Sequence, residues 1–124
     1  INKMKKILSL FMMSFFFVNC SAQEEIKSIS TIELKTLLEK GDIQLIDVRT
    51  PKEIELGFIK TAKFANFFDT NFYTNSSKQL VKSKPVYLYC RSGSRSGKSA
   101  KILQKEGYEV YNILGGYKQW KQEN

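Results

Sequence analysis

The sequence contains no histidine. Catalytic machinery of the Cys-His or Ser-His-Asp type is therefore excluded, because both use an imidazole to take the proton from the nucleophile. The sequence also lacks a cluster of metal-ligating residues and a nucleotide-binding motif, so we expect neither a metal nor a cofactor. It holds only two cysteines, Cys20 and Cys90. A nucleophile in this chain must be activated by groups other than histidine.

A length of 124 residues with 42% hydrophobic content indicates one domain with a modest core. The formal net charge is +8, and it falls to +5 without the three lysines near the N-terminus, Lys3, Lys5 and Lys6. This moderate excess is compatible with small anionic substrates or with an anionic membrane surface. The lysines are dispersed and form no basic stripe with interleaved aromatics, so we expect no nucleic acid partner.

An export signal is predicted at residues 1–22. Residues 4–6 give it a cationic start, residues 7–18 form an apolar run broken only by two serines, and Cys20 follows. Because a spanning helix needs about 20 apolar residues, this run is too short to be a permanent anchor. The position of Cys20 resembles that of the lipidated cysteine in bacterial lipoprotein signals. The resemblance implies a mature N-terminus at Cys20 and an extracytoplasmic domain held at a bacterial membrane by lipid.

A competing interpretation is cleavage after Ala22. Cys20, Ser21 and Ala22 approximate the small-x-small pattern of an ordinary secretory site, and the product would be a soluble periplasmic protein. Either form of processing leaves Cys90 unpaired, which favours a reactive thiol. A disulfide between Cys20 and Cys90 would instead require the N-terminal segment to dock at Cys90.

Residues 23–27 form a polar segment that predicts a tether, and residues 28–124 remain for the domain. Apolar segments typical of buried strands alternate with helical patterns along it. The strands are predicted at residues 26–29, 45–48, 62–67, 86–89 and 109–113, and the helices at 30–41, 50–56, 78–81, 97–106 and from 116 onward. This alternation predicts an α/β fold, a parallel five-stranded sheet with helices on both faces. Phe67, Phe68, Phe72 and Tyr73 either belong to its core or form a lip over the loop at residues 91–96, and for Phe67 and Phe68 we expect the core.

The stretch of residues 84–106 brings a strand, a short loop and a helix together around one thiol. The strand at residues 86–89 ends at Cys90, and the helix follows the loop. The loop consists of six small or cationic residues, Arg91, Ser92, Gly93, Ser94, Arg95 and Ser96. The backbone amides of such a loop and the positive end of the helix dipole form a concave site for an anion.

The same loop is expected to lower the pKa of the Cys90 thiol. Amides and cations stabilise the thiolate, which is the nucleophilic form of cysteine. Without histidine, we expect the activation to come from the loop itself together with Arg91 or Arg95. The alternative is a buried cysteine at a strand end beside a solvated polar turn.

Residues 90–96, CRSGSRS, resemble the active loop of the rhodanese-like family, Cys-Arg-Ser-Gly-x-Arg-Ser. Three flanking segments share the resemblance: LIDVRTPKE at residues 45–53, GFIKTAKFAN at 57–66 and NILGGYKQW at 112–120. It covers about residues 26–122 and departs from the family at Phe58, where a histidine is frequent. The resemblance implies that three further residues support the active loop, Asp47, Arg49 and Glu53. The alternative for these three is a structural ion pair at the surface.

The resemblance implies a sulfurtransferase. Cys90 would attack the outer sulfur of a small anionic donor such as thiosulfate, become a persulfide, and pass the sulfur to a thiol or cyanide acceptor. The alternative is a non-catalytic or redox module of the same fold that holds an anion or a partner's thiol. A cysteine phosphatase is a third interpretation, but it needs a wider loop with arginine six residues after the cysteine. Here Ser96 occupies that place, so phosphate is expected to fit badly.

Overall fold

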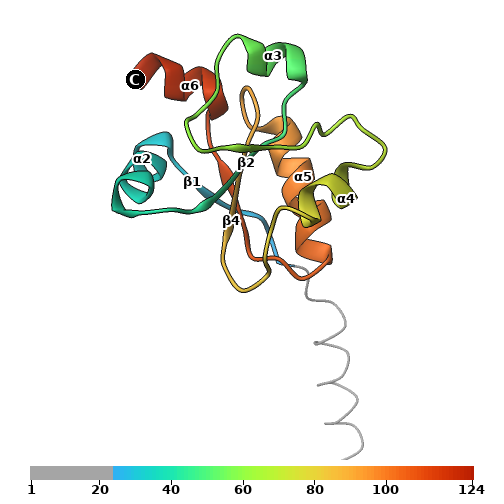
Figure 1. Ribbon diagram of the computed structural model, residues 1–124. Helices are drawn as coiled ribbons and strands as arrows, with labels where there is room; N and C mark the ends of the chain where they lie inside the picture. The colour runs from blue at the N-terminus through green and yellow to red at the C-terminus, as the bar shows by residue number, and fades with distance from the viewer. Residues whose placement is uncertain (1–23) are drawn as a thin grey trace, which may run out of the picture.

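The computed structural model describes residues 24–124. The predicted export signal, Cys20 and the first residue of the predicted tether lie outside the described residues. The elements, drawn in Figure 1, are β1 (Lys27–Ile29), α2 (Thr31–Lys40), β2 (Gln44–Asp47), α3 (Pro51–Glu55), β3 (Lys63–Phe64), α4 (Phe72–Ser77), β4 (Val86–Tyr89), α5 (Ser94–Lys105), β5 (Val110–Ile113) and α6 (Gly116–Glu123). Within this part of the chain, no helix has the length and apolar character needed to cross a membrane.

The five strands form one parallel sheet in the order β1-β5-β4-β2-β3. β4 lies at its centre, hydrogen-bonded to β2 on one side and to β5 on the other. Three of its four residues, Val86, Leu88 and Tyr89, are fully buried, as expected for a parallel strand that is covered on both faces. The predicted α/β fold with a parallel five-stranded sheet is confirmed.

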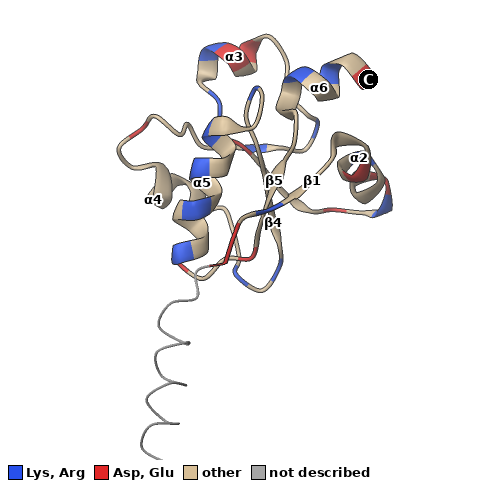
Figure 2. Cartoon of the chain, turned by 180° about the vertical axis from the view of Figure 1, so that it is seen from behind, with Lys and Arg blue, Asp and Glu red and all other residues tan. Residues whose placement is uncertain are grey.

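Helices cover both faces of the sheet. α2 and α6 lie on one side, and α4 and α5 lie on the other (Figures 1 and 2). The core is accordingly divided into two clusters. The cluster under α4 and α5 includes Ile46, Val86, Leu88, Phe72, Ala100 and Leu103. The cluster under α2 and α6 includes Leu34, Leu45, Ile59, Tyr89 and Ile113, with Tyr117 and Trp120 packed against it.

Two helices begin at the capping signals that the sequence carries. Ser30 caps α2 and Thr50 caps α3, and each side chain accepts a hydrogen bond from the backbone of a glutamate three residues later. Glu33 and Glu53 bond back to the backbone N–H of Ser30 and Thr50, which completes a capping box at each helix. The second box fixes the orientation of Glu53, which becomes important at the loop after β4.

Two predicted elements differ from the structure. The third strand was expected at residues 62–67, but β3 covers only Lys63–Phe64, because it pairs with just the last two residues of β2. The helix expected at residues 78–81 is absent at that place. It lies earlier, as α4, because Phe72 and Ser76 are buried on one helical face while Val81 is exposed.

The folded domain also starts before residue 28. Ile26 packs against the core cluster under α4 and α5, and Lys27 pairs with Tyr111 in the sheet. Because β5 offers its free edge to this segment, the end of the predicted tether is used as a strand. Fewer of residues 23–27 are therefore left for a tether than the composition suggested.

Candidate active site

β4 ends at Cys90, at the carboxyl edge of the sheet. The thiol is buried, with 1% of the residue exposed. The chain then forms a loop of three residues, Arg91 to Gly93, which stands beside α3 and α6 in both overall views (Figures 1 and 2). Gly93 has a φ of 118°, a conformation that favours glycine, and this allows the chain to turn back into α5. Ligands of open parallel sheets bind at this edge.

α5 begins at Ser94, three residues earlier than predicted. Serine and glycine have modest or low helix propensity, which is why the pattern indicated a start at Gly97. Tertiary contacts outweigh that propensity, because the side chains of Ser96 and Ser99 are buried on the face that packs against the sheet. The predicted loop is consequently tighter, and Arg95 and Ser96 lie in the first turn of a helix.

The sulfur of Cys90 is surrounded by hydrogen-bond donors. The backbone N–H of Gly93 donates to Sγ at 3.1 Å, and the hydroxyl oxygen of Ser96 lies 3.3 Å from it. Burial raises the pKa of the Cys90 thiol, but the Ser96 hydroxyl and the backbone amides of Ser96, Gly93 and Ser92 outweigh this effect. The net result is a pKa below the ordinary value for cysteine, which favours the thiolate.

The Ser96 hydroxyl has a second partner. Its oxygen lies 2.6 Å from Oδ1 of Asn112 on β5, and Nδ2 of Asn112 donates to the carbonyl of Gly93 at 3.1 Å. Since that carbonyl only accepts, the amide of Asn112 must present its oxygen to Ser96. Asn112 therefore connects the loop to the neighbouring strand and competes with the sulfur for the single hydroxyl proton.

Sequence analysis did not identify Asn112. The available signal was an amide side chain inside the otherwise apolar and aromatic strand of residues 110–113. A buried polar side chain requires a partner, and strands that neighbour β4 bring their residues close to the loop. The order of strands in the sheet was needed to recognise that β5 is such a neighbour.

Arg95 is held by Glu53. Two hydrogen bonds of 2.8 and 2.9 Å join its guanidinium to the two carboxylate oxygens. The bond from Arg95 is the main reason that the pKa of Glu53 lies at about 2. The pair is partly exposed. Of the three predicted supporting residues, Glu53 thus bonds directly to a residue of the predicted loop.

Both the loop and an arginine were expected to activate Cys90, and the loop groups have the larger effect. The groups that lower the pKa of Cys90 are the Ser96 hydroxyl and the loop amides, whereas the guanidinium of Arg95 faces Glu53. The charge of the thiolate contributes to the raised pKa of Arg95, but less than the bond to Glu53 does. Arg95 therefore acts on the sulfur only through space, and the side chain of Arg91 is exposed.

Asp47 and Arg49 form a buried ion pair at 2.7 Å. Arg49 also donates to the carbonyl of Gly57 at 2.8 Å and stacks over the ring of Tyr117, 4.3 Å from its centroid. The alternative of a surface ion pair is wrong for these two residues, because both are buried. They connect the segment after α3 to α6 and touch the loop only indirectly, through the element that carries Tyr117.

The first turn of α6 is bonded to the backbone around Cys90. The N–H of Tyr117 donates to the carbonyl of Cys90 at 2.8 Å, and that of Lys118 donates to the carbonyl of Arg91 at 3.0 Å. Gly116 makes this approach possible, because a Cβ there would lie 2.5 Å from the carbonyl oxygen of Cys90. A side chain at Gly116 would therefore push the two segments apart.

Phe68 is a second correction. It was expected in the core, but 64% of it is exposed, and its ring lies 5.6 Å from the guanidinium carbon of Arg95. Phe67 is partly buried against the core cluster, as expected. The Phe67 ring contacts those of Phe68 and Phe72, so this aromatic segment reaches from the core to the rim of the site.

The remaining predicted loop residues are exposed. The backbone amide of Ser92 is one of the groups that lower the pKa of Cys90. Ser94 is the first residue of α5, and it is exposed. Among residues 24–124, no three His, Cys, Asp or Glu side chains are grouped so that they could hold a metal ion.

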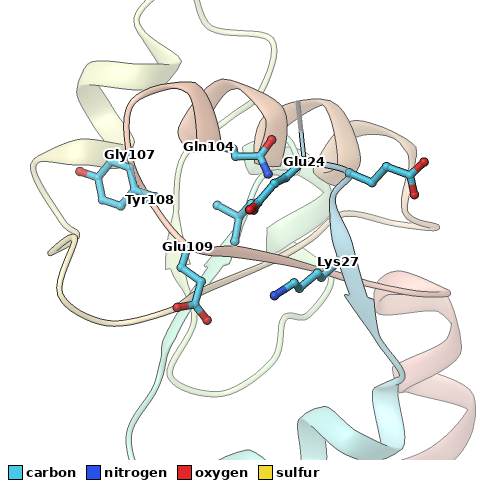
Figure 3. Close-up of a pocket in the computed structure, with 8 residues that line it drawn as sticks. Glu24, Lys27, Gln104, Gly107, Tyr108 and Glu109 are labelled. Carbon is cyan, nitrogen blue, oxygen red and sulfur yellow. The ribbon is translucent and has the colours of Figure 1, made fainter. Parts of the chain in front are cut away.

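A pocket lies at the amino ends of the strands, opposite the end at which Cys90 lies. Figure 3 shows the residues that line this cavity of about 310 Å³, among them Glu24, Lys27, Gln104, Tyr108 and Glu109. They come from the amino ends of β1 and β5 and from the end of α5. The lining includes no cysteine, so the Cys90 thiol and this pocket are separate features.

Comparisons with known proteins identify the family of this domain. Residues 30–123 match the family described as Rhodanese-like domain. The chain is 38% identical over 99 residues to the uncharacterised Bacillus subtilis protein YqhL, covering 79% of this chain and 75% of that protein. It is 35% identical over 96 residues to the thiosulfate sulfurtransferase GlpE of Coxiella burnetii, covering 77% of this chain and 87% of the relative.

A crystal structure of a rhodanese-like domain protein from Staphylococcus aureus is 34% identical in sequence and superposes with a TM-score of 0.69. The match covers 77% of this chain and 91% of that one. The family match over residues 30–123 includes strands β2 to β5 and the loop that carries the thiol, and it begins just after β1. The chain therefore belongs to the rhodanese-like domain family.

Proposed function

We propose that the protein is a sulfurtransferase that works through a persulfide on Cys90. The Cys90 thiolate attacks the outer sulfur of thiosulfate, a new S–S bond forms, and sulfite leaves with the electron pair of the old bond. An acceptor thiolate or cyanide then attacks the outer sulfur of the persulfide. The S–S bond breaks, and Cys90 returns to the thiolate.

One observation carries this proposal: the buried sulfur of Cys90 is held by the N–H of Gly93 and the hydroxyl of Ser96. These donors stabilise negative charge at the place where it is present before attack and after transfer. A leaving thiolate with a lowered pKa is also released more easily in the second step. Relatives named as sulfurtransferases support the same chemistry, and GlpE is named for thiosulfate.

The test compares the purified full chain with its Cys90→Ala variant. Intact mass after thiosulfate treatment should show one added sulfur on the wild type and none on the variant. Thiocyanate formation from thiosulfate and cyanide should likewise depend on Cys90. Equal activity in both proteins would overturn the assignment, and a wild type that gains no sulfur but binds sulfite or thiosulfate would favour a binding module.

We also propose an extracytoplasmic location for this chemistry. The support is the sequence pattern of residues 1–22 and the position of Cys20 after a short apolar run. Lipid attached at Cys20 would hold the domain at a bacterial membrane, since each buried CH₂ contributes about 0.8 kcal/mol of binding. Cleavage after Ala22 would instead release a soluble periplasmic domain with the same thiol.

A further inference from the structure

A groove lies between α3 and α6, directly beside the loop that follows Cys90. Its volume is about 760 Å³. Its lining consists of Arg49, Glu53, Leu56, Arg91, Tyr117, Lys118, Lys121 and Gln122. Figure 1 shows α3 and α6 on either side of the loop, and Figure 2 shows basic residues along α6. The loop and the groove share Arg91, the residue next to the thiol.

The lining has an excess of positive charge. Arg49 is neutralised by Asp47, and Glu53 is neutralised by Arg95. Arg91, Lys118 and Lys121 are exposed and form no ion pair with any residue in the described range 24–124. Three cations thus face the groove without an anionic partner from that range. Negatively charged groups of a ligand would be attracted to this groove.

The groove also has an apolar side. Leu56, at the end of α3, is 84% exposed, which is a large exposure for a leucine. On the α6 side stands the ring of Tyr117, which is partly buried by its stacking on Arg49. An apolar surface flanked by cations suits a ligand that combines carboxylates with a short aliphatic or peptide portion.

We propose that this groove binds the sulfur acceptor and that the acceptor is a low-molecular-weight thiol carrying carboxylates. The inference rests on the proposed sulfurtransferase function. The donor is a small anion for which the loop amides suffice, whereas the groove has the volume of a site for a larger molecule. Ion pairs between the carboxylates of the acceptor and Lys118, Lys121 and Arg91 would hold it in the groove. Its thiol would then reach past Arg91 to the outer sulfur of the Cys90 persulfide.

The kinetic test uses the full chain with Cys90 loaded as the persulfide. Single-turnover transfer is measured to glutathione, which carries two carboxylates, and to 2-mercaptoethanol, which is uncharged. In a Lys118→Gln, Lys121→Gln variant, transfer to glutathione should fall about tenfold, because attraction between charges on ligand and protein is lost. Transfer to 2-mercaptoethanol should change less than about twofold. Rising salt should slow only the glutathione reaction of the wild type.

The matched control is Lys101→Gln, Lys105→Gln, which removes the same charge from α5, away from the groove. This control should transfer sulfur to both thiols like the wild type. A loss that is equal for both acceptors, or a loss that the control shares, would overturn the proposal. So would unchanged transfer to glutathione in the α6 variant.

A binding measurement separates this inference from the proposed function. S-methylglutathione has no free thiol and cannot accept sulfur. In an NMR titration it should shift the amide signals of Leu56, Lys118 and Lys121 in the wild type, and much less in the α6 variant. Absence of these shifts would overturn the groove as an acceptor site. The sulfurtransferase proposal is judged separately, by the mass added to Cys90 with thiosulfate.

Discussion

The hydroxyl oxygen of Ser96 lies 2.6 Å from Oδ1 of Asn112, while it lies 3.3 Å from Sγ of Cys90. A hydroxyl has one proton to donate, so it serves either the amide oxygen or the thiolate. When Cys90 is a protonated thiol, the Ser96 hydroxyl donates to Oδ1 of Asn112, which is the nearer acceptor. When Cys90 ionises, the hydroxyl can turn to the sulfur.

Ser96→Ala should raise the pKa of Cys90, because it removes a hydrogen bond to the thiolate while the burial of the sulfur remains. The rate of reaction with iodoacetamide at neutral pH should fall about tenfold, as expected for the loss of a bond to a charged group. Alkylation rates measured against pH give the pKa directly. An unchanged midpoint would assign the activation to the amides alone.

Asn112→Ala provides the control for this interpretation. It releases the Ser96 hydroxyl from its competing acceptor, so the pKa of Cys90 should fall below that of the wild type. In the Ser96→Ala background the same substitution should leave the pKa where it is. A rise in both backgrounds would show that Asn112 acts only by holding the carbonyl of Gly93.

Glu53→Gln should make the free energy of unfolding vary less with pH between pH 5 and 2. The pKa of Glu53 is lowered to about 2 by Arg95, so the stability from this pair is present above the unfolded pKa of about 4.3 and is lost as pH falls through 2. The contribution should not exceed about 1 kcal/mol, because the pair is partly exposed. Urea unfolding from pH 5 to 2 measures it, with Glu55→Gln on the same helix as the control.

Gly116→Ala should destabilise the domain by about 1–3 kcal/mol, because its Cβ would overlap the carbonyl oxygens of Cys90 and Arg91. Gly97→Ala is the matched control. A Cβ at Gly97 meets only Nδ2 of Asn112 at 3.5 Å, and alanine favours the helix by up to about 1 kcal/mol. Urea midpoints of the two variants should therefore move in opposite directions. Equal midpoints would contradict the close approach of α6 to the loop.

Cys20→Ala should abolish lipid attachment in cells. Metabolic labelling with a fatty acid, followed by fractionation, should find labelled wild type in the membrane fraction and unlabelled variant elsewhere. A wild type that is unlabelled, soluble and begins at Gln23 would instead establish cleavage after Ala22.

The sequence alone was sufficient for the features that depend on neighbouring residues. The capping residues Ser30 and Thr50, the strand before Cys90 and the alternation of strands and helices are local signals, and the structure has all of them. An isolated thiol in a loop of small and cationic residues was likewise enough to locate the candidate site, because amide donors come from the same short segment as the sulfur.

Only the tertiary structure decided which side chains meet at that site. Asn112 reaches Ser96 across 16 residues and Arg95 reaches Glu53 across 42, and such pairs depend on the order of strands in the sheet. The same holds for Gly116, which matters because α6 approaches the carbonyl of Cys90, and for Phe68, which faces Arg95 instead of the core. Hydrophobic pattern and residue type specify burial and local conformation. Contacts between distant segments arise only when the packed sheet brings them together.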